Sequence, residues 1–336
     1  MTKKNKLIFG VISLISLTVL AWFFIQPLAP HTANTDTENV NDNAKLTVFT
    51  SILPQTYFVE QIGGDRVSVE SIVTPGSSPR TYEPTPKQMA DLNTADIFFS
   101  IGVSFEKALL PKITSSMPNL TIVNTRDGIN LRSMKSHTHA EDKEHKHHHT
   151  AKGENELHDK QHNKVHHHTG KDPHIWMSPK LVKIQAKTIA NALIEADPEG
   201  EDIYNRNLNS FIADLDALDV RMAEALAPVK GKTFMVFHPA FGYLADDYGL
   251  IQEPIEVEGK NPSGQQLARM IDLAKQQNVQ VIFVQAQFDT KSAKHIAEEI
   301  EGVVMPINPL SSDYINNMDK IANTIQQGLK SQSDLK

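Results

Sequence analysis

Two histidines stand where a parallel α/β sheet would present them to a ligand. His238 directly follows a short apolar segment, 233–237, that predicts a strand, and His174 lies in Asp-Pro-His-Ile-Trp just before a helical stretch. Asp289 comes shortly after a second apolar segment, 279–284. Ligands of open α/β sheets bind at the carboxyl ends of the strands. Two imidazoles and a carboxylate at that edge suit Zn²⁺, with Mn²⁺ or Fe²⁺ as alternatives.

Further candidates follow the strand predicted over 67–73. Arg80 and Glu83 lie there in Pro-Gly-Ser-Ser-Pro-Arg-Thr-Tyr-Glu-Pro. Spacing alone also allows structural roles for all the candidates, because a histidine after a strand is more often a hydrogen-bonded core residue, and an isolated Asp is more often a helix N-cap. The chain has no cysteine, so we expect any metal to be held by His, Asp and Glu, with no disulfide and no lipid on cysteine.

The elements that must position these residues alternate along the chain from residue 45. Short apolar segments alternate with amphipathic ones, which predicts parallel sheets with helices on both faces. The predicted strands are 46–50, 67–73, 97–101, 121–123, 233–237 and 279–284. The predicted helices are 54–63, one from 86, 105–110, 179–196, 201–226, 240–248, 263–277 and 291–300.

The helix predicted over 201–226 divides this pattern. Its apolar residues recur at 3.6-residue spacing, and it is long for a globular helix. We interpret residues 201–228 as a spine that joins an N-terminal lobe, 45–200, to a C-terminal lobe, 229–336. The expected fold class is therefore α/β, with two lobes that each hold a mostly parallel sheet flanked by helices, joined by one long helix.

The first 44 residues predict export. Lys3, Lys4 and Lys6 precede an uncharged apolar run, 7–25, as in a signal peptide. The length of the run and the lack of a clean cleavage site favour an uncleaved membrane anchor with a polar tether; a buried core helix is the alternative. We expect the rest of the chain to be periplasmic or otherwise extracytoplasmic, with membrane contact only through this segment. Without cysteine it is not expected to be a lipoprotein.

The charge balance argues against nucleic acid as a partner. The chain carries 33 basic and 40 acidic residues, a formal charge of −7. Phosphate binding requires a basic face. The length of 336 residues, with 40% hydrophobic residues, provides material for two cores.

Residues 133–170 break the alternation and contain many histidines. Apolar residues are almost absent, so the segment cannot bury enough surface to offset its ordering entropy, and we predict a mobile loop. Imidazoles are mostly neutral at neutral pH, which favours weak, multi-site metal collection over a merely solvated linker. The histidines are His137, His139, His145, His147, His148, His149, His158, His162, His166, His167 and His168.

Four segments resemble the metal-binding receptors of zinc and manganese ABC importers, the cluster A-I solute-binding proteins. They are Pro-Gly-Ser-Ser-Pro-x-Thr-Tyr-Glu-Pro-Thr-Pro at 75–86, Asp-Pro-His-Ile-Trp at 172–176, Phe-His-Pro-Ala-Phe-Gly-Tyr-Leu-Ala at 237–245 and Gln-Phe-Asp at 287–289. The resemblance covers roughly 45–330, and a His-rich loop just before Asp-Pro-His is typical of the zinc-uptake branch. It implies two lobes on a long helix, a metal in the cleft, and delivery to a membrane permease by a receptor that is not an enzyme and that we expect to be a monomer.

The resemblance also implies a ligand set. The histidines of Asp-Pro-His and Phe-His-Pro are ligands in that family, and a carboxylate of the last segment often completes the site, so we expect His174, His238 and Asp289 as a three-ligand core. Arg80 stands where the family usually has His. Arginine has no lone pair to donate, so we expect it to turn away or to be neutralised by Glu83 or Asp289. The first coordination position would be empty, or filled by water, Glu83 or a loop histidine.

Three other functions remain open on the sequence. Arg80 could face an anion, which would make the chain a receptor for a chelated metal or another anionic ligand. Three ligands with an open position also occur in zinc hydrolases, although no general-base motif such as His-Glu-x-x-His is present. The His-rich segment could also be the metal binder, with the globular part as scaffold.

Overall fold

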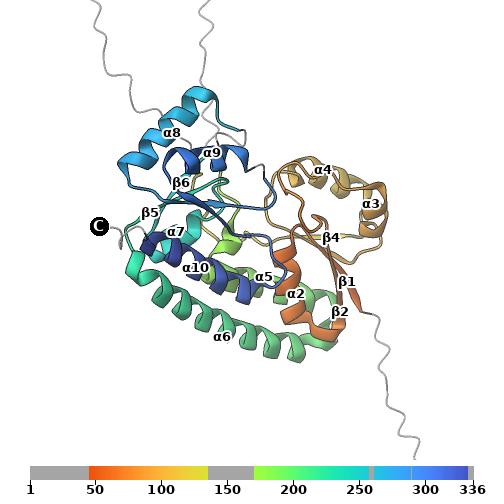
Figure 1. Ribbon diagram of the computed structural model, residues 1–336. Helices are drawn as coiled ribbons and strands as arrows, with labels where there is room; N and C mark the ends of the chain where they lie inside the picture. Colours follow the sequence, from red (N-terminus) through yellow and green to blue (C-terminus); the bar gives the residue numbers. More distant parts are fainter. Residues whose placement is uncertain (1–44, 135–169, 257–260, 289, 332–336) are drawn as a thin grey trace, which may run out of the picture. The chain divides into compact units, whose positions relative to one another are not determined.

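The computed structural model describes residues 45–134, 170–256, 261–288 and 290–331, which belong to one compact unit (Figure 1). The predicted export segment, 1–44, and most of the predicted loop lie outside the described residues. No helix in the described ranges is long and apolar enough to cross a bilayer. The unit contains two four-stranded sheets in which every strand pair is parallel.

The N-terminal sheet has the order β2-β1-β3-β4. Its centre is β1 and β3, where β3 (Ile-Phe-Phe-Ser) is buried along its whole length. From β1 the chain passes first to β2 on one side and then to β3 and β4 on the other, so the strand order switches between β1 and β3. In open α/β sheets the ligand crevice lies at such a switch point, at the carboxyl ends of the strands. The strands are β1 (Leu46–Thr50), β2 (Val67–Ser71), β3 (Ile97–Ser100) and β4 (Thr121–Asn124), and the helices are α2 (Leu53–Gly63), α3 (Pro86–Leu92) and α4 (Glu106–Ser116).

The C-terminal sheet repeats this topology, with the order β6-β5-β7-β8. The two edge strands, β6 and β8, were not predicted, because β6 is the polar stretch Ile-Gln-Glu-Pro and both strands are largely exposed or half-buried. The strands are β5 (Thr233–Val236), β6 (Ile251–Pro254), β7 (Val281–Val284) and β8 (Val303–Pro306), and the helices are α7 (Gly242–Tyr248), α8 (Gly264–Gln276) and α9 (Lys291–Glu299).

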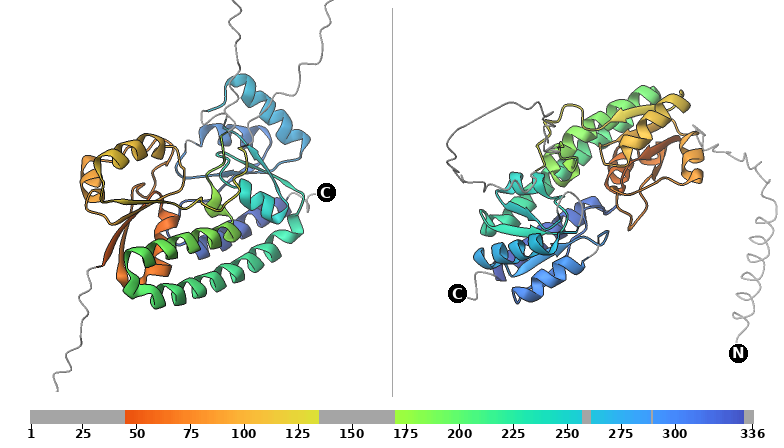
Figure 2. Two further views of the ribbon diagram at one scale, coloured as in Figure 1. Left: turned by 180° about the vertical axis from the view of Figure 1, so that it is seen from behind. Right: turned by 90° about the horizontal axis from the view of Figure 1, so that it is seen from above.

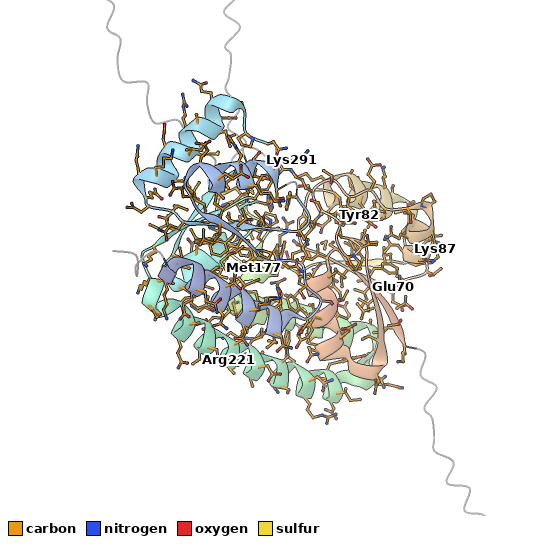
Figure 3. All side chains as sticks on the ribbon, in the orientation of Figure 1. Glu70, Tyr82, Lys87, Met177, Arg221 and Lys291 are labelled. Atoms are coloured by element: carbon orange, nitrogen blue, oxygen red, sulfur yellow. The ribbon has the colours of Figure 1, made fainter. Side chains whose placement is uncertain are left out.

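The predicted spine is α6 (Glu201–Leu226), whose buried face carries Tyr204, Phe211 and Leu218. It does not stand alone. α5 (Pro179–Ala196) and α10 (Tyr314–Ser331) pack along it, and it also touches α2 and α7, so one helical layer runs beside both sheets (Figures 1 and 2). Arg221 of α6, labelled in Figure 3, is one link in this layer. It pairs with Asp319 of α10 at 2.8 Å. The predicted fold class is confirmed, and α10 is an addition to it.

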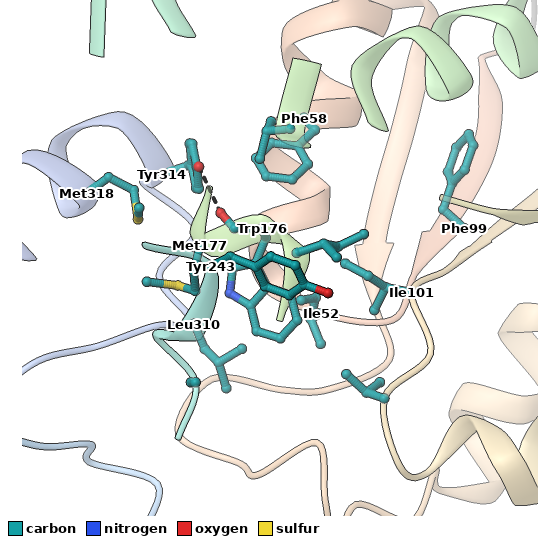
Figure 4. Close-up of a cluster of buried hydrophobic side chains, with 14 of the residues drawn as sticks. Ile52, Phe58, Phe99, Ile101, Trp176, Met177, Tyr243, Leu310, Tyr314 and Met318 are labelled. Atoms are coloured by element: carbon teal, nitrogen blue, oxygen red, sulfur yellow. Dashed lines mark hydrogen bonds between the residues drawn. The ribbon is translucent and has the colours of Figure 1, made fainter. Parts of the chain in front are cut away.

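One hydrophobic core crosses from the first sheet to the second. It includes Phe98 of β3 and Phe283 of β7, while a smaller cluster lies under α8 and α9. Trp176 is buried where the two sides meet. Its Nε1 donates to the carbonyl of Pro309 at 2.7 Å, and the Tyr314 hydroxyl donates to the Trp176 carbonyl at 2.8 Å (Figure 4). The two sheets are therefore held together by shared packing as well as by α6.

The chain leaves and re-enters the described structure at neighbouring points around the His-rich segment. Ser133 and Lys171 form an isolated antiparallel bridge, and the Met134 amide donates to the Gly170 carbonyl at 3.0 Å. The segment that carries His174 begins directly after this bridge. It continues as the short 3₁₀ helix Ile175–Met177, which is buried, and then as α5.

Candidate metal centre

The carboxyl edge of the C-terminal sheet fixes the backbone of His238. This residue follows β5, beside Gln285, which follows β7 and is fully buried. Gln285 Oε1 accepts from the His238 amide at 3.1 Å, and Gln285 Nε2 donates to the His238 carbonyl at 2.6 Å. The amide side chain thus satisfies both backbone groups of His238 and fixes the backbone from which the imidazole projects.

Glu256 orients the His238 ring. It lies just beyond β6, where its amide donates to the Phe237 carbonyl at 3.0 Å and extends the β5–β6 pairing. Its carboxylate is buried, with Oε1 2.8 Å from His238 Nδ1 and 3.0 Å from Arg80 Nη1. An ionised carboxylate only accepts hydrogen bonds, so Nδ1 carries the proton and Nε2 of a neutral ring keeps its lone pair.

Asp172 does the same for His174. Its Oδ1 accepts from the His174 amide at 3.0 Å and lies 2.7 Å from His174 Nδ1. Arg132 Nη1 donates to the other oxygen at 3.3 Å. Burial on its own raises the pKa of Asp172, but the contacts with His174 and Arg132 outweigh it, and the pKa lies below its usual value. The carboxylate therefore stays ionised and fixes the tautomer of His174.

The two imidazoles point their free nitrogens at one another. His174 Nε2 and His238 Nε2 are 3.1 Å apart, and the residues are only 7% and 9% exposed. Two nitrogens ~2.0–2.1 Å from a tetrahedral zinc ion lie ~3.4 Å apart, so this spacing is within a few tenths of an ångström of a chelating pair. Burial lowers the pKa of His238, and His174 and Arg80 add to this against the opposing effect of Glu256. A neutral ring with its lone pair available is the form that binds a metal.

Aromatic rings pack against the two imidazoles. Phe288 stacks on His238 with ring centroids 4.7 Å apart, and Trp176 lies 5.1 Å from the His174 ring. Both histidines are thus hydrogen-bonded and buried, as the structural alternative required. A purely structural role, however, explains only the hydrogen bonds of the two Nδ1 atoms. The two Nε2 atoms face each other and need a proton or a cation between them.

Arg80 lies at this site but not as a ligand. Its side chain is one-third exposed, and it pairs with the buried Glu256 of the opposite sheet. The sequence had suggested Glu83 or Asp289 for that partner; Glu83 has an exposed side chain.

Asp289 lies outside the described residues, so its place in the ligand core stays a prediction. Its neighbours are described: Phe288 stacks on His238, and Thr290 is the N-cap residue of α9. The capping role considered for Asp289 stays an alternative prediction. Among the described residues, no group of three or more His, Asp or Glu side chains is arranged to hold a metal.

The loop histidines also lie outside the described residues. These are His137, His139, His145, His147, His148, His149, His158, His162, His166, His167 and His168. Their predicted weak metal binding remains a prediction.

Four residues of the site were not predicted from the sequence: Asp172, Arg132, Glu256 and Gln285. Asp172 stood inside the Asp-Pro-His segment, where an acidic residue two positions before a histidine can bond its ring. Glu256 would have followed from the rule of carboxyl strand ends if β6 had been recognised. Gln285 directly follows the strand predicted over 279–284, so the same rule could have found it. Arg132 left no local signal, because its partner Asp172 is 40 positions away.

The fold is that of an α/β protein with two parallel sheets of one topology, and the paired imidazoles are its candidate metal site. The family described as periplasmic zinc-uptake complex component A, ZnuA, matches residues 48–328, and the chain belongs to this family.

Known relatives cover almost the whole chain. The high-affinity zinc uptake system protein ZnuA of Bacillus subtilis (strain 168) is 30% identical over 309 residues, which are 90% of this chain and 91% of that protein. A crystal structure of ZnuA is 37% identical with a TM-score of 0.73, over 85% of this chain and 99% of that one. A ZnuA deletion mutant with zinc bound is 38% identical with a TM-score of 0.72, over 84% of this chain and 98% of that one.

Proposed function

We propose that the chain is the extracytoplasmic receptor of a zinc-uptake system, which binds Zn²⁺ and delivers it to an ABC-type membrane permease. The observation that carries the proposal is the 3.1 Å separation of His174 Nε2 and His238 Nε2, with each Nδ1 held by a buried carboxylate. Membership in the zinc-uptake family supports zinc as the cargo. Imidazole nitrogen also favours zinc over manganese, which prefers oxygen ligands.

Asp289 is proposed as the third ligand. The stacking of its neighbour Phe288 on His238 supports this assignment, since Asp289 directly follows a residue whose ring contacts a ligand. A carboxylate beside two imidazoles would partly neutralise the incoming ion and complete a common zinc donor set. The remaining position is left to water, Glu83 or a loop histidine.

The wider organisation follows from the same proposal. The lobes would be 45–200 and 229–336, with 201–228 between them, acting as a monomeric receptor rather than an enzyme. The basic and apolar N-terminal segment would export the chain and hold it at the membrane, since no cysteine is available for a lipid. The loop histidines would collect metal weakly near the centre.

Titration calorimetry on the full chain with Zn²⁺ and Mn²⁺ tests the proposal. We expect one tight zinc site above a background of weak ones, with weaker binding of manganese. In the double variant His174→Ala/His238→Ala the Kd of the tight site should rise by more than about 100-fold, while the weak sites stay unchanged. Even a change beside the ligands costs about 10–100-fold in affinity. His295→Ala, which removes an exposed histidine of α9, is the matched control. Tight binding that survives the double variant would refute the paired imidazoles as the binding site.

A further inference from the structure

Arg80 joins the metal centre to the opposite sheet through Glu256. It lies in the segment between β2 and α3 of the N-terminal side, whereas Glu256 lies just beyond β6 of the C-terminal side, 176 positions further along the chain. Glu256 Oε1 receives both Arg80 Nη1 at 3.0 Å and His238 Nδ1 at 2.8 Å. One carboxylate oxygen is therefore shared between an arginine and a metal-facing imidazole.

Because Glu256 is buried, its charge depends on the cation that Arg80 provides. The carboxylate is 4% exposed and the Arg80 side chain 33% exposed, so the guanidinium covers a buried charge from the solvent side. A buried carboxylate that loses its cation is left with an uncompensated charge and takes another cation where one is near. Glu256 touches Nδ1 of His238, whose Nε2 borders the proposed metal position.

The second imidazole is backed in the same manner, by Asp172 and Arg132. Arg132 is also shared with a third carboxylate, Asp246, at 2.9 Å. Glu256 and Asp172 are both committed to hydrogen bonds with the imidazoles. Removing Arg80 would make these surroundings more negative by one charge and take from Glu256 the guanidinium that holds it from the N-terminal side.

We propose that Arg80 is a positioning residue that sets metal selectivity, because it keeps Glu256 on His238 Nδ1 and away from the metal itself. This inference rests on the proposed function. Carboxylate oxygen is a preferred ligand of Mn²⁺, whereas imidazole suits Zn²⁺. Holding Glu256 back therefore leaves a nitrogen-rich site that favours zinc.

The test is a set of zinc and manganese Kd values for the full chain and its Arg80 variants. Arg80→Met should tighten manganese binding by about tenfold or more and zinc binding by less, so that the preference for zinc falls. Arg80→Lys keeps the charge and should keep the preference. In Arg80→Met/Glu256→Gln the gain for manganese should disappear, because the carboxylate that produced it is gone.

Arg221→Met is the matched control, since it removes the same charge from an Arg–Asp pair between α6 and α10. An equal gain for manganese in this variant would attribute the effect to net charge and overturn the inference. Unchanged selectivity in Arg80→Met, or a gain that persists in the double variant, would overturn it as well. These outcomes leave the proposed function standing if His174→Ala/His238→Ala still abolishes the tight zinc site; a tight site insensitive to that change would refute both.

Discussion

Gly242→Ala tests whether Arg132 supports the metal centre from behind Asp172. Gly242 is the first residue of α7, and a Cβ placed there would overlap Arg132 Nη1 and lie 2.6 Å from Arg132 Cζ and 3.0 Å from Asp172 Oδ2. The guanidinium cannot stay in place. Asp172 would lose its contact with Arg132 while remaining buried and bound to His174.

The magnitude follows from that loss. A hydrogen bond to a charged group contributes about 1.5–3 kcal/mol. Alanine in place of glycine in a helix returns about 0.5–1 kcal/mol. The free energy of unfolding should therefore fall by about 0.5–2.5 kcal/mol. Because Asp172 orients His174, zinc affinity should also fall, by about 10–100-fold.

Urea unfolding of the metal-free chain and zinc titration with a competing chelator measure the two effects. Gly264→Ala is the matched control, because Gly264 is the first residue of α8 and a Cβ added there would meet no heavy atom within 4 Å. The control should be as stable as the wild type or more so, with unchanged zinc affinity. If Gly242→Ala behaves like Gly264→Ala in both assays, Arg132 has no role at the site.

Three further changes test other parts of the structure. Asp289→Asn should weaken zinc binding in calorimetry by about tenfold or more, as for loss of a ligand charge; an unchanged Kd would remove Asp289 from the ligand set. Trp176→Phe should lower the free energy of unfolding by about 1–3 kcal/mol, because the Pro309 carbonyl loses its donor in the core; an unchanged urea midpoint would contradict this. The hydrogen bond from Arg66 lowers the pKa of Asp197 despite partial burial, so its contribution to stability is present above the unfolded pKa of ~4 and is lost as pH falls through the folded value. Asp197→Asn should therefore be less stable than the wild type at neutral pH, with the difference shrinking in acid; a gap independent of pH would refute the assignment.

The central elements of the fold were predictable because their sequences are unambiguous. α5 and α6 match the predicted residues, since α5 begins with a proline and α6 has a long 3.6-residue periodicity. The buried strand β7 was placed correctly except for its first residues. The edge strand β6 was not found, because Ile-Gln-Glu-Pro has neither alternation nor a continuous apolar run.

The site followed the same division. His174 and His238 were identified because they lie in distinctive segments at the ends of elements. The ion pair of Arg80 with Glu256 was not predicted, because Glu256 follows the strand that was missed and lies 176 positions away, while the suggested pairing with Asp289 stays a prediction. Local patterns indicate which side chains reach a sheet edge, whereas the pairing of charges across two sheets depends on three-dimensional packing that no short window contains.

The bridge between Ser133 and Lys171 makes the position of His174 independent of the length of the His-rich segment. Residues 134 and 170 are joined by a backbone hydrogen bond, so the chain between them starts and ends at the same place whatever its length. Doubling the length of a segment closed in this way costs only about 0.6 kcal/mol. Insertions, deletions and changes of histidine number between these two residues would therefore leave the position of His174 unchanged, so the metal collection predicted for the loop would vary independently of the proposed capture site.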